Sequence, residues 1–376
     1  MPPDCGGVGY YTAQVAAGLA QAGDVVTVAC PPQRSTPAPV PGVQLLLLDD
    51  LYGRSSRREL DRRLDERRSI LLVEYVPTAF GLGGANLPLC RWLLGRATRG
   101  RDDVRVMFHE PYFEFGWAPL HRSALSIAQR RMARTLLRAS RHTYLSTDAW
   151  RRYLEPYQRS QSPAPIVSLP IPASIPASAC PQAVDAHRAR LLGSRSGPLL
   201  GHFGTYGAHV APMLRPALIE ILRAQPDTAA ICAGAGSDAF VAGILAAEPA
   251  LAGRLEASGR APAADVADML SSCDLLLQPF PDGVTTRRTS VMAGLINGRA
   301  VLSTAGHLTE TVWRDTQAVE MTPAGDARAY VAAALRLIAD SDARAALGAR
   351  GLDLYRDRFA LEHTIHALRS APAVAA

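Results

Sequence analysis

Short apolar runs alternate with amphipathic segments along the whole 376-residue chain. The apolar runs have the length of buried strands, which we expect at residues 25–29, 43–48, 70–73, 104–108, 142–145, 166–169, 199–203, 228–233, 275–278 and 300–303. Helices are expected between them, at residues 11–22, 54–67, 123–139, 212–224, 263–271, 290–297 and 327–339. Short strands that alternate with helices are typical of parallel, doubly wound α/β sheets.

The charge of the chain divides it into two halves. Residues 1–190 hold 24 Arg against 16 Asp and Glu, whereas residues 191–376 hold 16 against 18. The change falls near a stretch rich in Pro, Ser and Ala at 162–186, which is typical of a linker. We therefore predict a Rossmann-like domain at 1–172, a linker at 173–196 and a second such domain at 197–355. Residues 356–376 should form a C-terminal helix and tail that return to the first domain.

Composition excludes several classes of protein. All 40 basic residues are arginine, so no lysine is present to form a Schiff base or to complete a P-loop. The longest apolar run, residues 329–335, is far shorter than a membrane span, and the N-terminus lacks the pattern of a signal peptide. The six cysteines form no C-x-x-C pair, which disfavours a zinc site and fits a reducing cytoplasm.

Two features of the first half are candidates for binding. Gly6, Gly7 and Val8 open an apolar helix, and backbone N–H groups at a helix start can hold an anion. A tight turn without a ligand would explain the same glycines. His109 follows the expected strand 104–108, at the edge where open α/β sheets bind ligands. It could bond a substrate hydroxyl or exchange a proton, or it could be a structural histidine.

In the second half, glycine-rich loops end the first two expected strands, with Gly204 and Thr205 in one loop and Gly234 and Gly236 in the other. Small residues there would let a nucleotide approach the backbone, although such glycines are common in turns.

A polar loop follows the buried strand 275–278. Asp282 could accept hydrogen bonds from sugar hydroxyls, and the amides of residues 283–286 could face an anion. Arg287 and Arg288 could neutralise a diphosphate. The alternative is a capped helix start with exposed arginines.

Taken in order, these segments resemble the retaining family 4 glycosyltransferases of GT-B fold. The resemblance covers most of the chain and rests on PPDCGGVGYYT, HEPY, GTYG, GRAP and residues 279–301. It implies two Rossmann-like domains, the first binding a saccharide or lipid-linked acceptor and the second a nucleotide-sugar donor. It also implies front-face transfer with retention and without a metal or other cofactor, and a bacterial role in polysaccharide or glycolipid biosynthesis.

The same resemblance suggests roles for residues. It places Gly6, Gly7 and Val8 near the donor phosphate or the acceptor, His109 near the transferred sugar, and Asp282 as the first acid of an E-x7-E motif. The predicted catalytic residues are His109 and Asp282. The predicted donor-binding residues are Gly6, Gly7, Gly204, Thr205, Gly234, Gly236, Gly283, Val284, Thr285, Arg287, Arg288 and Ser290.

Three departures from the family pattern matter. The second acid is replaced by Ser290 or Ala293, depending on the alignment, and no Arg/Lys pair follows the first strand of the second domain, where His209 stands nearest. Arg287 and Arg288 are expected to replace that pair. A strand before the glycine loop has no counterpart, so we expect a shortened or altered first domain.

The arginines suggest where an anionic partner would bind. Arginines at 54–68 are interleaved with acids and should pair on their own helix. Arg130, Arg131, Arg134, Arg138 and Arg141 lack acidic neighbours and are better candidates for peripheral contact with an anionic membrane. No motif or aromatic pattern indicates nucleic-acid binding.

Other functions remain open. A nucleotide-sugar epimerase would need clustered acids and histidines, and a dehydrogenase would need the G-x-G-x-x-G fingerprint, which is not matched. A degenerate, non-catalytic GT-B partner would fit the missing acid and strand.

Overall fold

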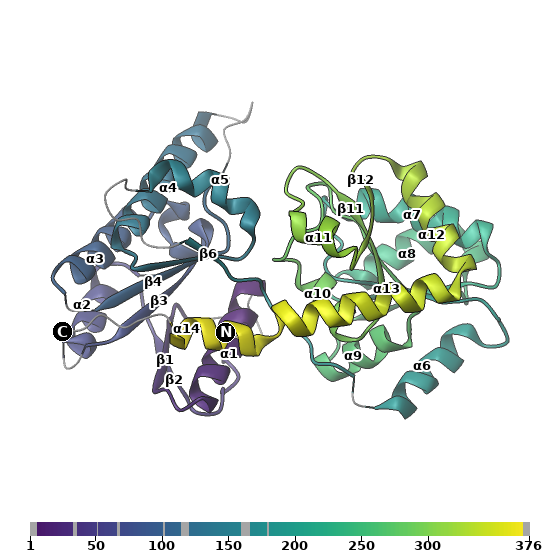
Figure 1. Ribbon diagram of the computed structural model, residues 1–376, viewed down its shortest axis with the longest axis horizontal. Coiled ribbons are helices and arrows are strands. Elements are labelled where there is room, and N and C mark those ends of the chain that lie inside the picture. The colour runs from purple at the N-terminus through teal and green to yellow at the C-terminus, as the bar shows by residue number, and fades with distance from the viewer. Residues whose placement is uncertain are drawn as a thin grey trace. The chain divides into compact units, whose positions relative to one another are not determined.

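The computed structural model describes residues 6–32, 36–50, 52–65, 68–100, 102–113, 120–158, 166–178 and 180–370 (Figure 1). Contacts between residues group the chain into two compact units. Unit 1 comprises Met1–Ile171 and Leu361–Ala376, and unit 2 comprises Pro172–Ala360. The end of the chain therefore belongs to the same unit as its beginning.

Unit 2 contains a continuous sheet of six parallel strands in the order β12-β11-β10-β7-β8-β9. Strand order reverses between β7 and β10, and ligands of open α/β sheets bind beside the carboxyl ends of the strands at such a point. The strands are β7 (Leu199–Phe203), β8 (Ala229–Ala233), β9 (Leu255–Gly259), β10 (Leu275–Gln278), β11 (Ala300–Ala305) and β12 (Glu320–Pro323).

Helices cover both faces of this sheet, as the doubly wound prediction requires. One apolar core joins the sheet to α6 (Pro181–Leu192), α9 (Ala263–Ser272), α10 (Thr289–Ile296) and α11 (Thr311–Thr316). The other core joins it to α7 (Ala211–Ala224), α8 (Ser237–Ala247) and α12 (Ala327–Ala339). The remaining elements are the 3-10 helix η5 (Pro249–Leu251), α13 (Ser341–Leu354) and the π-helical turn η6 (Tyr355–Phe359).

Unit 1 is also parallel α/β, but its described strands form two separate sheets. One is the pair β1 (Val26–Cys30) and β2 (Val43–Leu47). The other has the order β3-β4-β5-β6, with β3 (Ile70–Tyr75), β4 (Asp103–Phe108), β5 (His142–Leu145) and β6 (Ile166–Ser168). Among the described residues, no strand precedes the first helix.

The first and last helices of the chain pack together in unit 1. Tyr11 and Val15 of α1 (Gly7–Gln21) share a core with Met107 of β4 and with Leu368 of α14 (Leu361–Ser370). Gly18 permits this packing, because a Cβ there would lie 2.7 Å from Ile365 Cδ1. The other helices are α2 (Arg54–Leu64), α3 (Leu87–Thr98), α4 (Leu120–Ala139), α5 (Arg151–Leu154) and the short η1 (Pro77–Phe80), η2 (Leu82–Gly84), η3 (Asp148–Trp150) and η4 (Glu155–Tyr157).

The predicted α/β class is confirmed, and each expected strand is present with ends that differ by at most two residues. The sequence missed β9 and β12 because LEASG and EMTP are not apolar runs. It also treated 173–196 as a linker, yet this stretch contains α6. Pro181 suits the first turn of a helix, and Leu191 and Leu192 bury the end of α6 in the core.

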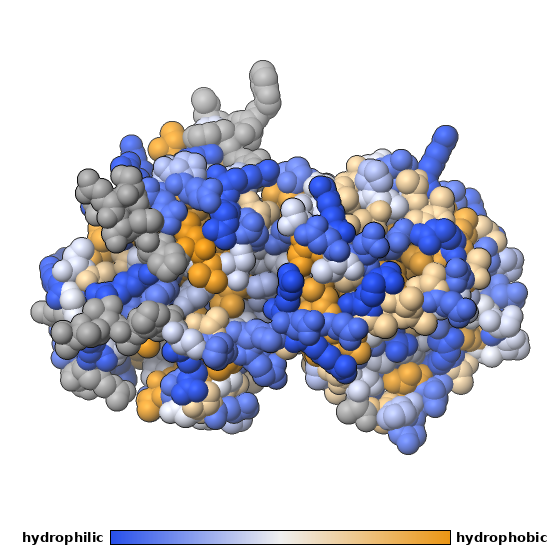
Figure 2. Space-filling model, viewed as in Figure 1, coloured by the Kyte–Doolittle hydropathy of each residue, from blue (hydrophilic) through white to orange (hydrophobic). Residues whose placement is uncertain are grey.

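Hydrophilic residues cover most of the face seen in Figure 2, with hydrophobic residues in small patches. In the part of the chain that the structure describes, every helix is too short or too polar to cross a bilayer.

Candidate active site

The ends of β7 and β8 in unit 2 are brought together by close backbone contact. The Gly204 amide donates to the Ala233 carbonyl at 3.1 Å, and a Cβ at Gly234 would lie 2.4 Å from the Gly204 oxygen. Gly204 and Gly234 have φ values of +151° and +110°, which disfavour other residues. Thr205 is exposed, and Gly236 precedes α8 with φ +88°. Backbone conformation and close packing therefore explain why glycine stands at these positions, independently of the predicted binding role.

The loop after β10 carries an ion-pair cluster. The Asp282 carboxylate accepts hydrogen bonds from Arg288 and, at 3.3 Å, from Arg287 Nη2. The Arg288 guanidinium also lies over the Phe280 ring, 4.3 Å from its centroid. All three charged side chains are about one-fifth exposed. The cluster has one excess positive charge and reaches solvent, which are the properties of an anion site.

Most of the loop amides predicted to face an anion already donate within the protein. The Gly283 amide bonds the Phe280 carbonyl at 3.1 Å, and the Val284 amide bonds the Thr304 carbonyl at 2.8 Å. Thr285 is fully buried. Helix geometry leaves the first amides of α10, those of Thr289 and Ser290, without an intrahelical acceptor. Ser290 lies near the first loop, since its Cβ is 3.9 Å from a Cβ built on Gly204.

Glu310, which was not predicted from the sequence, anchors this loop through Thr286. Its buried carboxylate accepts from the Thr286 amide at 2.6 Å and from Thr286 Oγ1 at 2.7 Å. Trp313 Nε1 donates to the same carboxylate at 3.4 Å. The only sequence signal was an acid shortly after the strand at 300–305, 24 residues from the partner that it binds.

His109 lies in unit 1, directly after β4, and is 7% exposed. Its Nε2 atom is 2.8 Å from Oε2 of Glu74. Like Glu310, Glu74 was not among the residues predicted from the sequence. The signal for Glu74 was a single carboxylate within the apolar strand ILLVEY.

The glycine loop of unit 1 is connected to His109 through α1. Gly6 is the N-cap of α1 and Gly7 its first residue, and a Cβ on either would meet no described atom within 4 Å. One helical turn later, the Tyr11 ring contacts the His109 ring edge-on, with centroids 5.0 Å apart. Packing in unit 1 therefore does not demand these two glycines, and the predicted binding role stays a prediction.

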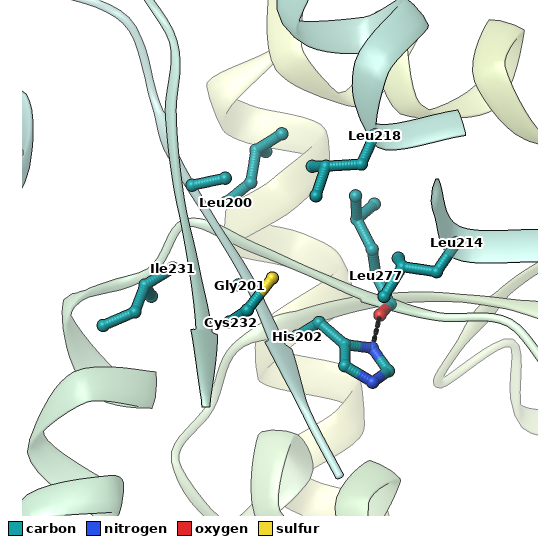
Figure 3. Close-up of a pocket in the computed structure, with 9 residues that line it drawn as sticks. Leu200, Gly201, His202, Leu214, Leu218, Ile231, Cys232 and Leu277 are labelled. Atoms are coloured by element: carbon teal, nitrogen blue, oxygen red, sulfur yellow. Dashed lines mark hydrogen bonds between the residues drawn. The ribbon is translucent and has the colours of Figure 1, made fainter. Parts of the chain in front are cut away.

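A void beside β7 is not a ligand site. It is lined by apolar side chains of β7, β8, β10 and α7 and by His202, and it does not admit a water molecule (Figure 3). His202 Nδ1 donates to the Leu277 carbonyl at 2.7 Å, whereas its buried Nε2 has no partner in the described structure. Burial lowers the pKa of His202 from 6.5 to about 4.

Among the described residues, no group of three His, Cys, Asp or Glu side chains could hold a metal ion. Two arginines of α2 pair on their own helix, since Arg62 and Arg63 both bond Glu59, Arg63 through Nε at 2.6 Å. The neighbouring acids Asp61 and Asp65 pair instead with Arg96 of α3. On α4, Arg131, Arg134 and Arg138 are exposed. Arg130 instead lies over the Tyr112 ring at 4.2 Å, and Arg141 is half-buried.

A scan against protein-family models found no match, and neither did a search of curated proteins. Solved structures do match over nearly the whole chain. HepE of Anabaena, in complex with UDP and glucose, has a TM-score of 0.66 at 15% identity and covers 97% of this chain and 95% of its own. Sucrose-phosphate synthase of Thermosynechococcus elongatus has a TM-score of 0.69 at 14% identity, covering 97% and 92%.

WaaG, a glycosyltransferase involved in lipopolysaccharide biosynthesis, has a TM-score of 0.63 at 15% identity and covers 98% of this chain and 97% of its own. These likenesses show that the chain has the GT-B fold of such glycosyltransferases, as the sequence predicted. At identities of 14–15% these likenesses establish the fold alone, and the reaction has to be inferred from the residues of the candidate site.

Proposed function

We propose that the protein is a retaining glycosyltransferase that moves a sugar from a nucleotide-sugar to a saccharide or lipid-linked acceptor. The observation that carries this proposal is the cluster of Asp282, Arg287 and Arg288 in the loop that leads into α10. Ser290 of α10 lies near Gly204, at the point where the strand order of unit 2 reverses. HepE, which shares the fold, has been solved in complex with UDP-glucose.

The diphosphate of the donor would bind this cluster and the open amides of Thr289 and Ser290. Guanidinium groups and helix N-termini both favour phosphate oxygens. Arg287 and Arg288 are already oriented by Asp282, so binding would order few additional side chains. Glu310 would keep the loop in place behind them.

Sugar transfer would require no metal and no other cofactor. In the front-face mechanism, the acceptor hydroxyl loses its proton to a donor phosphate oxygen and attacks the anomeric carbon. The bond from that carbon to the phosphate oxygen breaks on the same face, and the nucleoside diphosphate leaves with the electron pair. Asp282 would accept hydrogen bonds from sugar hydroxyls, and His109 would contact the transferred sugar.

The acceptor would bind to unit 1, and a lipid-linked acceptor would bring the protein to the cytoplasmic face of a membrane. Arg131, Arg134 and Arg138 support this peripheral contact because they form an exposed basic strip on α4.

Donor binding is tested by thermal unfolding with UDP, GDP, ADP or TDP. One of them should stabilise the protein, by about 2.7 kcal/mol at a hundred times its dissociation constant. Arg288→Ala should weaken that nucleotide about 10-fold or more, because it removes a charge-assisted hydrogen bond. Arg336→Ala is the matched control, since this arginine pairs with Glu320 at the unit surface. No stabilisation by any of the four would contradict the proposal.

A non-catalytic GT-B partner is the second candidate. Ser290 or Ala293, depending on the alignment, stands where the family pattern has its second acid, and the Gly283 and Val284 amides are already engaged. Turnover of the stabilising nucleotide's sugar conjugate with a crude acceptor extract would exclude this alternative. Binding without turnover would favour it.

A further inference from the structure

Glu74 and His109 form a buried acid–imidazole pair in unit 1. They extend from the neighbouring parallel strands β3 and β4, whose last residues Tyr75 and Phe108 lie opposite each other. His109 Nε2 and Glu74 Oε2 are 2.8 Å apart, and the two side chains are only 8% and 12% exposed. The pair is therefore a buried contact fixed by two neighbouring strands, unlike an ion pair between mobile surface side chains.

The imidazole is fixed by its backbone and by one aromatic ring. The His109 amide donates to the Tyr75 carbonyl at 3.0 Å. Its carbonyl accepts from Trp150 Nε1 at 2.8 Å and from Ser146 Oγ at 3.2 Å. The Tyr11 ring contacts the imidazole edge-on at 77°. The first three contacts hold the His109 backbone in place, and the Tyr11 ring packs against the imidazole itself.

A carboxylate accepts hydrogen bonds, so the Glu74 contact places the imidazole hydrogen on Nε2. In the neutral ring, Nδ1 then carries a lone pair. Within the described residues, Nδ1 has no hydrogen-bond partner and is not among the buried atoms that lack one. The lone pair therefore reaches the molecular surface.

We infer that Glu74 is a positioning residue that fixes the tautomer of His109, so that Nδ1 offers an acceptor to a ligand hydroxyl. This arrangement selects for a group that can donate, such as a sugar hydroxyl, and against carbonyl and phosphate oxygens, which only accept. The identification of the ligand as a sugar rests on the proposed glycosyltransferase function. The tautomer does not depend on that function.

The tautomer is measured on the full chain labelled with 15N-histidine, from long-range 1H–15N correlations at pH 8. The His109 signals are assigned by their loss in His109→Gln. His202 is an internal reference of the opposite kind, because its Nδ1 donates to the Leu277 carbonyl. His109 should show the hydrogen almost entirely on Nε2, and Glu74→Ala should raise the share of the Nδ1–H tautomer toward that of a free histidine. Glu74→Gln, which keeps an acceptor oxygen, should retain it.

Glu59→Gln is the matched control, because it removes a carboxylate from the surface of the same unit. It should leave the His109 signals unchanged. A hydrogen on Nδ1 in the parent protein, or an unchanged ratio of the two tautomers in Glu74→Ala, would overturn the inference.

Kinetics separate positioning from a merely structural role. Glu74→Ala should lower kcat about 10- to 100-fold, by analogy with residues that orient metal-binding histidines, while the donor KM stays nearly constant. Its effect should largely disappear in a His109→Ala background, because the two residues act as one unit. Additive effects would contradict the inference. A parent protein without turnover would contradict the proposed function, while the tautomer measurement would still decide the inference.

Discussion

The two units of this protein use the same strand–helix pattern, yet their sheets differ. In unit 2, β7 and β10 each have a strand on both sides, and every residue of β10 is buried. In unit 1, β1 and β3 each have one partner among the described strands, and their residues are mostly half-buried. All the large hydrophobic side chains found exposed in the described chain also lie in unit 1.

This difference indicates where each unit can position binding and reactive residues. The reversal of strand order between β7 and β10 provides a site at the edge of a continuous sheet, where the Asp282 cluster lies. In unit 1, the Glu74–His109 pair joins β3 to the residue that follows β4, a strand that has neighbours on both sides. Three predictions test how independent and how unequal the units are.

The largest expected effect is the loss of a core side chain from either unit. Trp313 in unit 2 is fully buried and packs against Phe359, so Trp313→Ala should cost about 3–5 kcal/mol. Arg96→Ala in unit 1 should cost a similar amount, about 3–5 kcal/mol, because it leaves the fully buried Asp102 carboxylate without a cationic partner. Hydrogen-exchange mass spectrometry during urea unfolding should place each loss in its own unit. Equal loss in both units would contradict independent cores.

Acid should affect unit 2 through His202. Its folded pKa of about 4 lies below the unfolded value of 6.5, so the unfolded chain binds the proton more readily. The stability present above pH 6.5 should therefore fall by about 3 kcal/mol as the pH drops toward 4. His202→Asn, which keeps a donor toward the Leu277 carbonyl and does not titrate there, should lose less. The measurement is urea unfolding of unit 2 against pH, and equal acid sensitivity in both proteins would contradict it.

The smallest effect concerns the sheet edges in the native state. Alternate amides of β3 point away from its only described partner, whereas amides of β10 face strands on both sides. Native-state hydrogen exchange should therefore be about 10-fold faster or more for the outward amides of β3 than for β10. The amides of β4, which has two partners in the same unit, are the internal control. Equal protection of β3 and β4 would remove the contrast between the two sheets.

The sequence predicted the parts of the site that depend on local order. Gly204, Gly234 and Asp282 follow apolar strands, so their place at the carboxyl edge of a parallel sheet could be inferred before any contact was known. The partners of these residues could not. Glu310 is 24 residues from Thr286 and meets it only because β10 and β11 are adjacent.

The same reason explains the misses in the fold. β9 and β12 have too few apolar residues to be recognised, and they become strands because β8 and β11 supply hydrogen-bond partners. α6 was hidden in a proline-rich stretch, and it becomes part of unit 2 because Leu191 and Leu192 are buried there.

By itself, the sequence determined the α/β class, the strand ends that carry the candidate residues and the absence of lysine chemistry. These follow from periodicity and residue type, which act over a few neighbouring residues. Only the tertiary structure decided that Asp282 orients two arginines and that Glu74 meets His109. It also decided that the sheet of unit 2 is continuous, whereas the described strands of unit 1 form two sheets. Hydrogen bonds and ion pairs require atoms within about 3 Å, and between distant residues chain folding alone sets that distance.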